Sequence, residues 1–179
     1  LMNVIGGIDR PTCGSVVIDG KNIFDMNESD RAIIRRINIG IVYQFYNLIP
    51  NLTVDENIML PCLLDQRKPD AGKLERIVEM TGLSNRRKHL PGQLSGGQQQ
   101  RVSVGRALIN DPAFILADEP TGNLDSRSGR EVIELLMAAN RKSGQTLILI
   151  THDENIALQA NRILTISDGR IIRDEVIRG

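Results

Sequence analysis

Residues 114–120 read Phe-Ile-Leu-Ala-Asp-Glu-Pro, and this stretch determines the fold class. It opens with an apolar run of strand length and ends in two adjacent acids, Asp118 and Glu119. In open α/β sheets, ligands bind at the carboxyl ends of the strands, which is where these acids fall. An aspartate suits the water shell of a Mg²⁺ ion, and a glutamate suits a general base that orients an attacking water. Two acids at a strand end also occur as an ordinary solvated turn, so this stretch alone leaves both interpretations open.

Further apolar segments of strand length lie on both sides of this stretch. They cover residues 39–43, 146–151 and 162–166. Amphipathic patterns typical of helices alternate with them, at 71–81, 98–108 and 126–141. Apolar strands that alternate with helices predict an α/β domain with a largely parallel sheet. Asp168-Gly169 predicts a hairpin turn after the last strand.

The segment 45–92 is richer in helix signals, and we predict that it forms a helical subdomain inserted into the domain. Thr53 and Glu56 have the spacing of a capping box, which predicts a helix start. Pro61 is expected to end that helix. The whole chain, residues 1–179, fits one domain that is large enough to bury a core.

Composition excludes several classes of function. The chain has 22 basic and 22 acidic side chains, and aromatic residues make up 3% of it. We therefore predict no nucleic-acid partner, because neither a basic surface nor a base-stacking platform is indicated. No apolar run approaches the roughly 18–20 residues that span a bilayer, so a membrane link would need a partner protein. Cys13 and Cys62 lack metal-ligand spacing and are interpreted as free thiols of a reducing cytoplasm.

A second motif is the string Leu94-Ser95-Gly96-Gly97-Gln98-Gln99-Gln100-Arg101, which we call the signature. Its two glycines would let the backbone approach a ligand closely. The serine and the free N–H groups of the helix that follows can hold an anion. The alternative is an ordinary serine cap with a glycine-rich entry.

Two single residues also stand where predicted strands end. Gln44 follows 39–43, and His152 follows 146–151. Each means little alone, and a lone histidine at such a position is more often structural. The order of all the motifs along the chain carries the information.

That order, with Asn123-Leu124-Asp125 after the acidic strand, strongly resembles the ATP-binding cassette (ABC) ATPase family, from Leu1 to about Arg170. Residues 117–125, Ala-Asp-Glu-Pro-Thr-Gly-Asn-Leu-Asp, are typical of the bacterial branch that serves lipoprotein release, macrolide export and antimicrobial-peptide export. Residues 43–50, Tyr-Gln-Phe-Tyr-Asn-Leu-Ile-Pro, are typical of it too. The resemblance implies a P-loop NTPase-like, mostly parallel sheet with helices on both faces and the inserted helical subdomain.

The resemblance also implies roles for the acids and the strand-end residues. Glu119 would be the catalytic base, and His152 would contact the γ-phosphate of ATP. Asp118 would coordinate Mg²⁺ through water. Gln44 would touch the Mg²⁺ and the attacking water, while its loop faces a transmembrane permease.

The remaining implied roles concern a second ATPase subunit, in a homodimer as the expected arrangement. Ser95, Gly96, Gly97 and Gln98 would bind the γ-phosphate of ATP held by the opposite subunit. Asp125 would cross the dimer interface. ATP binding and hydrolysis would then open and close the dimer and drive a permease, with the ATPase lying peripherally on the cytoplasmic face of a bacterial cell membrane.

The chain departs from the family pattern in one respect. The glycine-rich loop that ends in Gly-Lys-Ser/Thr is absent from these 179 residues. In the family this loop directly precedes the helix that here begins at Leu1. We therefore interpret the chain as a fragment of a normal ATPase that lacks the N-terminal strands of the sheet. The alternative is a native protein without the loop.

This loop and its lysine supply most of the hold on phosphate, so residues 1–179 by themselves are expected to bind Mg-ATP weakly. Missing strands would expose a sheet edge and apolar surface, which predicts poor solubility. A nucleotide titration and a thermal melt of this segment check both expectations. Tight binding, or a cooperative melt of a clean monomer, would contradict them.

Two other functions share parts of the pattern. A DNA-repair ATPase head carries the same signature string, but it also carries a long coiled coil, and no sustained heptads occur here. A non-catalytic subunit could donate only its signature residues to a partner, but such a donor needs neither Glu119 nor His152. The sequence does not identify the transported substrate.

Overall fold

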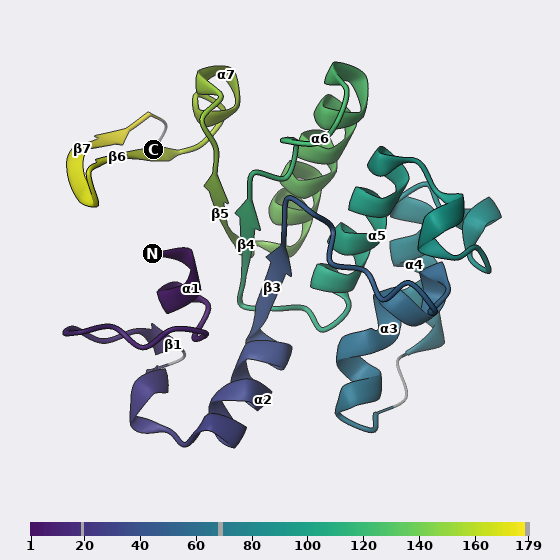
Figure 1. Cartoon of the computed structure of the whole chain (residues 1–179), viewed down its shortest axis with the longest axis horizontal. Helices are drawn as coiled ribbons and strands as arrows, with labels where there is room; N and C mark the ends of the chain where they lie inside the picture. Colours follow the sequence, from purple (N-terminus) through teal and green to yellow (C-terminus); the bar gives the residue numbers. More distant parts are fainter. Residues whose placement is uncertain (19, 68–69, 178–179) are drawn as a thin grey trace.

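A computed structural model describes residues 1–18, 20–67 and 70–177. Figure 1 shows the elements in chain order. The helices are α1 (Met2–Ile5), α2 (Glu28–Asn38), α3 (Val54–Leu64), α4 (Ala71–Met80), α5 (Gly96–Leu108), α6 (Ser126–Ser143) and α7 (Glu154–Ala157), with 3-10 turns at Ile23–Asp25, Ser84–Arg86 and Pro91–Gln93. The strands are β1 (Val17–Ile18), β2 (Lys21–Asn22), β3 (Ile39–Val42), β4 (Phe114–Asp118), β5 (Thr146–Ile150), β6 (Arg162–Ser167) and β7 (Arg170–Val176).

The centre of the molecule is a parallel sheet in the order β3-β4-β5. Val42 of β3 pairs with Ala117 of β4, and Asp118 of β4 pairs with Ile150 of β5. Because the strands are parallel, their carboxyl ends lie at one edge of the sheet. The predicted α/β fold with a parallel sheet is confirmed.

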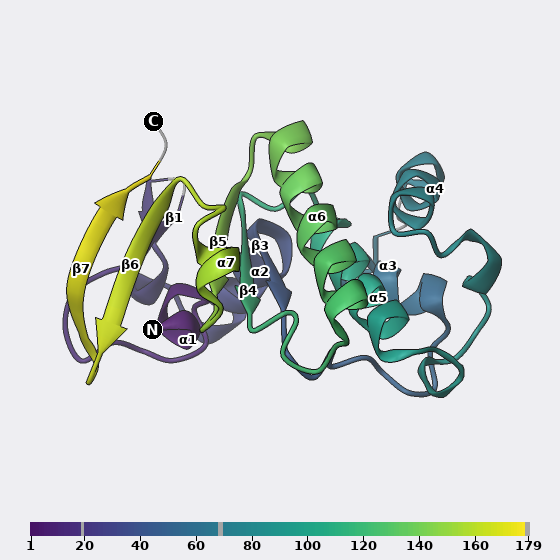
Figure 2. The same ribbon diagram turned by 90° about the horizontal axis from the view of Figure 1, so that it is seen from above.

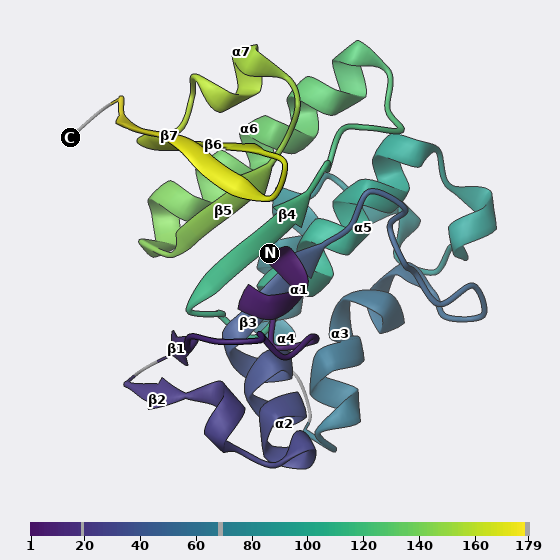
Figure 3. The same ribbon diagram turned by 60° about the vertical axis from the view of Figure 1, so that its left-hand side comes forward.

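Both faces of this sheet are covered, because side chains alternate along β4. Ile115 and Ala117 belong to a cluster with side chains of α3, α4, α5 and α6. Leu116 belongs to a second cluster, on the opposite face, with Met2 of α1. Figure 2 shows α5 and α6 on one side of the sheet, and Figure 3 shows α1 lying over β4 on the other.

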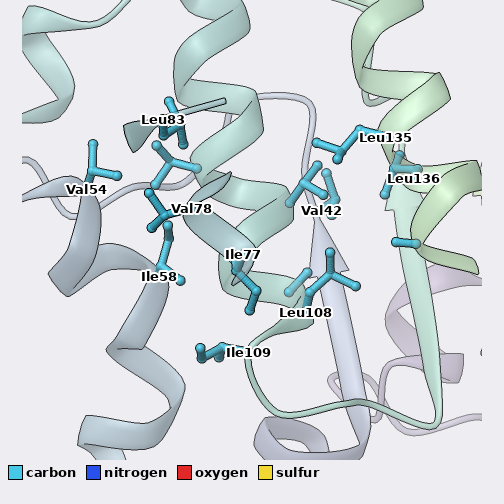
Figure 4. Close-up of a cluster of buried hydrophobic side chains, with 14 of the residues drawn as sticks. Val42, Val54, Ile58, Ile77, Val78, Leu83, Leu108, Ile109, Leu135 and Leu136 are labelled. Atoms are coloured by element: carbon cyan, nitrogen blue, oxygen red, sulfur yellow. The ribbon is translucent and has the colours of Figure 1, made fainter. Parts of the chain in front are cut away.

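The larger cluster holds α3 and α4 against α5 (Figure 4). Ile58 and Val78 are fully buried in it. A Cβ atom at Gly105 of α5 would lie 3.0 Å from Ile77 and 3.2 Å from Ile58, so the glycine lets the three helices approach closely. Whether 45–92 behaves as a separate subdomain stays a prediction.

The capping box at Thr53 is confirmed, but the predicted end of its helix is wrong. The Thr53 hydroxyl accepts a hydrogen bond from the amide of Glu56, and the Glu56 carboxylate accepts one from the amide of Thr53. The helix continues through Pro61 to Leu64. Ile58 and Cys62 are buried on either side of the proline, and this packing outweighs the hydrogen bond that a proline removes.

Apolar side chains are exposed at the β5 edge of the sheet and on the separate β6–β7 hairpin. Among the described strands, β5 pairs with β4 alone, and its Ile150 is half-exposed. The antiparallel β6–β7 hairpin, with its turn at the predicted Asp168-Gly169, presents Leu164, Ile171 and Val176 to solvent. In the described part of the chain, no helix is both long and apolar enough to cross a bilayer.

The fully buried Ile58 provides a test of this core. We expect Ile58→Ala to lower the free energy of unfolding by about 2–5 kcal/mol, because it removes apolar contacts and leaves a cavity. Urea denaturation followed by circular dichroism measures the change. The control is Ile33→Ala on α2, where the side chain is 43% exposed and the expected change is within about 0.5 kcal/mol. Equal effects of the two substitutions would contradict the packing described.

Candidate active site

Four of the predicted residues meet at the carboxyl edge of the sheet. Gln44 lies two residues after β3, and His152 lies two residues after β5. Asp118 is the last residue of β4, and Glu119 comes directly after it. The register of the sheet is what brings them together, because Asp118 pairs with Ile150. The structure therefore assembles residues that are up to 108 positions apart in the sequence.

Glu119 and His152 are in direct contact. Nδ1 of the imidazole lies 2.8 Å from Oε1 of the carboxylate. A carboxylate only accepts hydrogen bonds, so this contact places the imidazole proton on Nδ1 and turns Nε2 outward. The Glu119 side chain is 21% exposed and that of His152 is 86% exposed. The pair therefore lies at an open surface, with the carboxylate the more sheltered partner.

The backbone of Glu119 is also unusual. Its φ angle is +42°, in the left-handed region that residues other than glycine rarely adopt. Its amide donates a hydrogen bond to the carbonyl of Ile150, 3.0 Å away, which extends the parallel ladder by one residue. Strained backbone of this kind is frequent where a side chain has to be aimed.

Asp118 is the last residue of β4 and lies beside Tyr43, which follows β3. Burial raises the pKa of the Tyr43 phenol, and the Asp118 carboxylate adds to this effect, while the charges of Arg106 and Arg35 oppose it. Asp118 therefore brings a negative charge to a partly desolvated edge of the sheet.

Gln44 packs against the loop that follows the acids. A Cβ atom at Gly122 would lie 2.7 Å from Nε2 of Gln44, so a larger residue there would displace the end of this side chain. Nδ2 of Asn123 donates a hydrogen bond to the carbonyl of Gln44, at 3.1 Å. Gly122 and Asn123 lie within the stretch 117–125 that is typical of the family branch, but the sequence does not predict either contact.

The oxygen atoms at this edge fit a magnesium ion. Asp118 offers a carboxylate and Gln44 an amide carbonyl, and both are hard oxygen donors. The described residues contain no cluster of three or more His, Cys, Asp or Glu that could hold a metal. Mg²⁺ usually keeps several waters and binds through one or two carboxylates and substrate phosphates, so a small protein donor set suits it.

The signature residues begin α5. Ser95 is the N-cap: its hydroxyl oxygen accepts from the amide of Gln98, and the Gln98 side chain accepts from the amide of Ser95. The ordinary cap that sequence analysis left open is thus present. The cap uses a lone pair of the Ser95 hydroxyl, so the hydroxyl proton remains able to meet an anion.

The two glycines of the signature have a packing role that sequence reasoning missed. A Cβ atom at Gly96 would lie 2.8 Å from the hydroxyl of Tyr46, and one at Gly97 would lie 2.8 Å from the hydroxyl of Ser128. The start of α5 therefore lies directly against the loop after Gln44 and against the first turn of α6.

Asp125 caps α6. Its Oδ1 accepts hydrogen bonds from the amides of Arg127 and Ser128, at 3.1 and 3.0 Å. Hydrogen bonds from Ser128 and from these amides hold the pKa of the carboxyl below its usual range. Since Ser128 touches Gly97, the structure brings Asp125 and the signature residues into one group.

The chain is similar to known proteins over most of its length. The model of the family described as "ABC transporter" matches residues 1–122. The chain is 47% identical to the uncharacterized ABC transporter ATP-binding protein Rv0986 of Mycobacterium tuberculosis, over 96% of this chain and 70% of the relative. It is 42% identical to the lipoprotein-releasing system ATP-binding protein LolD of Geobacter metallireducens, over 97% and 78%. It is also 44% identical to a macrolide export ATP-binding/permease protein MacB of Paracoccus denitrificans, over 97% of this chain and 26% of the relative.

A solved structure is similar over the same range. It is described as a dimeric, post-hydrolysis state of the ATP-binding cassette MJ0796 bound to ADP and Pi. The TM-score is 0.88 at 42% sequence identity, and the similarity covers 99% of this chain and 79% of that one.

The Glu119–His152 contact predicts a pH dependence. The hydrogen bond to Glu119 and its charge raise the pKa of His152 above the usual value. The stabilising contribution of the pair is thus complete below the ordinary histidine pKa and is lost as pH rises through the raised one. We expect Glu119→Gln to lower the pKa of His152 in an NMR titration of the imidazole. The control is Glu154→Gln, two residues from His152, and an equal shift in both variants would contradict the assignment.

Proposed function

This chain belongs to the ABC transporter family, whose ATP-binding subunits hydrolyse ATP, and we propose how its residues divide that work. Glu119 is the general base, His152 holds it in place, and Asp118 and Gln44 face Mg²⁺. The signature residues and Asp125 serve the ATP of a second subunit. The observation that carries the proposal is the 2.8 Å contact between Glu119 and His152, at the carboxyl edge of the sheet beside Asp118.

Glu119 is suited to orient an attacking water. Its carboxylate is sheltered but reachable, and its backbone is fixed by the bond to Ile150. One carboxylate oxygen is held by His152, which leaves the other free to accept a hydrogen bond from water. A base held in this way has little freedom to turn away from its water. With Nδ1 engaged, Nε2 of His152 is the nitrogen that would reach the γ-phosphate, and it donates a hydrogen bond there when the imidazole is protonated on both nitrogens.

Asp118 and Gln44 would hold Mg²⁺, Asp118 through a water and Gln44 through its amide oxygen. When bound, the ion would neutralise negative charge on the phosphates. The contribution of the chain is orientation: Asp118 is fixed by the β4 ladder, and Gln44 by Gly122 and Asn123.

The signature residues would act across a dimer. The start of α5 directs N–H groups outward and carries the hydroxyl of Ser95, and both favour a phosphate. The solved relative, the ATP-binding cassette MJ0796, is a dimer bound to ADP and Pi, and this supports the arrangement. Two copies of this chain would then enclose each ATP between Ser95, Gly96, Gly97 and Gln98 of one subunit and the sheet edge of the other, with Asp125 at the interface.

A permease would be the partner in the membrane. The names of two relatives support this: one belongs to a lipoprotein-releasing system, and the other combines an ATP-binding and a permease part for macrolide export. The ATPase would lie on the cytoplasmic face of a cell membrane, bound to the permease. The alternative functions, a DNA-repair head and a donor of signature residues only, receive no support from the comparisons.

Glu119 provides the decisive test. In the subunit expressed from its full coding sequence, Glu119→Gln should lower the steady-state rate of ATP hydrolysis by roughly 10²-fold or more, because general-base catalysis is lost. ATP binding, measured by equilibrium titration, should persist. The matched control is Glu79→Gln on the exposed surface of α4, which should hydrolyse ATP at the unaltered rate. Normal turnover by the Glu119→Gln variant would remove this residue from its proposed role.

A further inference from the structure

The loop that carries Gln44 has an unfavourable backbone conformation just after this residue. Tyr46 and Asn47, two and three residues after Gln44, have φ angles of +60° and +48°. Residues other than glycine rarely adopt the left-handed region, although asparagine tolerates it better than tyrosine does, so two such residues in succession are unfavourable. Such a conformation persists only where surrounding groups fix it.

Arg106 supplies the groups that fix this loop. Its guanidinium donates hydrogen bonds to the carbonyls of both left-handed residues, at 2.8 Å to Tyr46 and 2.5 Å to Asn47. Burial lowers the pKa of Arg106, opposed by the nearby Tyr43. In the described part of the chain, Arg106 forms no salt bridge with a carboxylate, so these carbonyls are what its partly buried charge meets. The planar fork of arginine suits two acceptors at once.

The backbone is also held just before the loop and at Gln44 itself. The fully buried Gln100 donates from Nε2 to the carbonyl of Tyr43, at 3.2 Å. Asn123 donates to the carbonyl of Gln44. Side chains therefore bind the carbonyls on both sides of Gln44, and Gln100 and Arg106 both come from α5.

Helix α5 makes close packing contacts at the residues directly before and after Arg106. Gly105 lies against Ile58 and Ile77. The carbonyl of Ala107 would lie only 2.6 Å from a Cβ atom at Gly40, so α5 and β3 are in close contact. Arg106 lies between these two contacts and cannot shift without disturbing one of them. The guanidinium is therefore presented to the loop from a fixed point.

We propose that Arg106 is a positioning residue for ATP hydrolysis, which holds Gln44 in its working orientation by binding the carbonyls of Tyr46 and Asn47. This rests on the proposed role of Gln44. Helix α5 also begins with the signature residues, which would bind the ATP of the neighbouring subunit. Arg106 therefore connects this helix to the Gln44 loop, which would act on the ATP of its own subunit. Its loss should slow hydrolysis and leave ATP binding nearly unchanged.

The test uses the subunit expressed from its full coding sequence, with steady-state ATP hydrolysis as the readout. Arg106→Lys keeps the charge but not the fork, and kcat should fall roughly 10-fold, since small misplacements of an active group are costly. KM for ATP should change less than about 2-fold, because the loop orients a group that acts in the chemical step. Should that variant fail to fold, Arg106→Gln retains a planar donor and serves in its place.

A matched control separates positioning from stability. Arg36→Lys replaces a half-buried arginine of α2 that also makes a two-nitrogen contact, with Asp65. Arg36 precedes β3, whereas Gln44 follows the carboxyl end of that strand. It should lower the melting temperature by a similar amount while kcat stays within about 2-fold of the wild type. An equal loss of kcat in both variants would overturn the proposal, because general destabilisation would then explain it.

Combination with Gln44→Ala decides whether Arg106 acts through Gln44. If it does, Arg106→Lys should have no further effect on kcat in the Gln44→Ala background. Multiplied effects in the double variant would overturn the positioning role while leaving Gln44 its own. If Gln44→Ala alone leaves kcat unchanged, the proposed role of Gln44 fails and the positioning role fails with it. The Glu119→Gln result stands independently of either outcome.

Discussion

The amide of Glu119 donates a hydrogen bond to the carbonyl of Ile150, and the geometry of the site follows from this bond. It continues the β4–β5 ladder one residue beyond Asp118, although Glu119 has already left the extended conformation. As a result, a residue with a positive φ angle is held as firmly as a residue within the strand. The neighbouring strand delivers His152 two residues later, and the carboxylate and imidazole meet at 2.8 Å. Without that bond, the strain at Glu119 could relax and the contact would be lost.

Helix α5 supplies the second constraint, and glycines make it possible. Gly105 admits Ile58 and Ile77, and Gly40 admits the carbonyl of Ala107. A methyl group at Gly40 would clash with the backbone of Ala107, and one at Gly105 would press on Ile77 and Ile58, so the helix lies close against β3, α3 and α4. Gln100 and Arg106, which bind backbone carbonyls on either side of Gln44, therefore project from a closely packed helix. Packing in the core in this way determines the geometry at an edge of the sheet that is partly open to solvent.

Local patterns predicted much of the fold. The apolar strands, the capping box at Thr53 and the turn at Asp168-Gly169 are each encoded within a few residues, and each was predicted. Pro61 was misread because its tolerance depends on the burial of Ile58 and Cys62, which is a tertiary effect. The family resemblance named residues of the sheet edge, and the structure shows that they converge, while their chemical roles stay predictions.

Arg106 was missed for a different reason. Its partners are backbone carbonyls about 60 positions away, and a backbone carbonyl leaves no mark in the amino-acid sequence. The glycines of the signature were read as space for a ligand, whereas the structure shows Tyr46 and Ser128 in part of that space. Side chains that recognise the main chain, and glycines that make room for neighbours within the chain, become visible only in three dimensions.

These contacts constrain how the two parts of the site can respond to nucleotide. The hydroxyl of Tyr46 lies against Gly96, at the start of α5, while the carbonyl of Tyr46 is bound by Arg106, near its end. One loop residue thus touches both ends of the same helix. A tilt of α5 that moved the signature residues toward a neighbouring subunit would also displace the loop that carries Gln44. If the signature residues serve a second subunit as proposed, a shift at one half-site would reach the other half-site of the same subunit through α5.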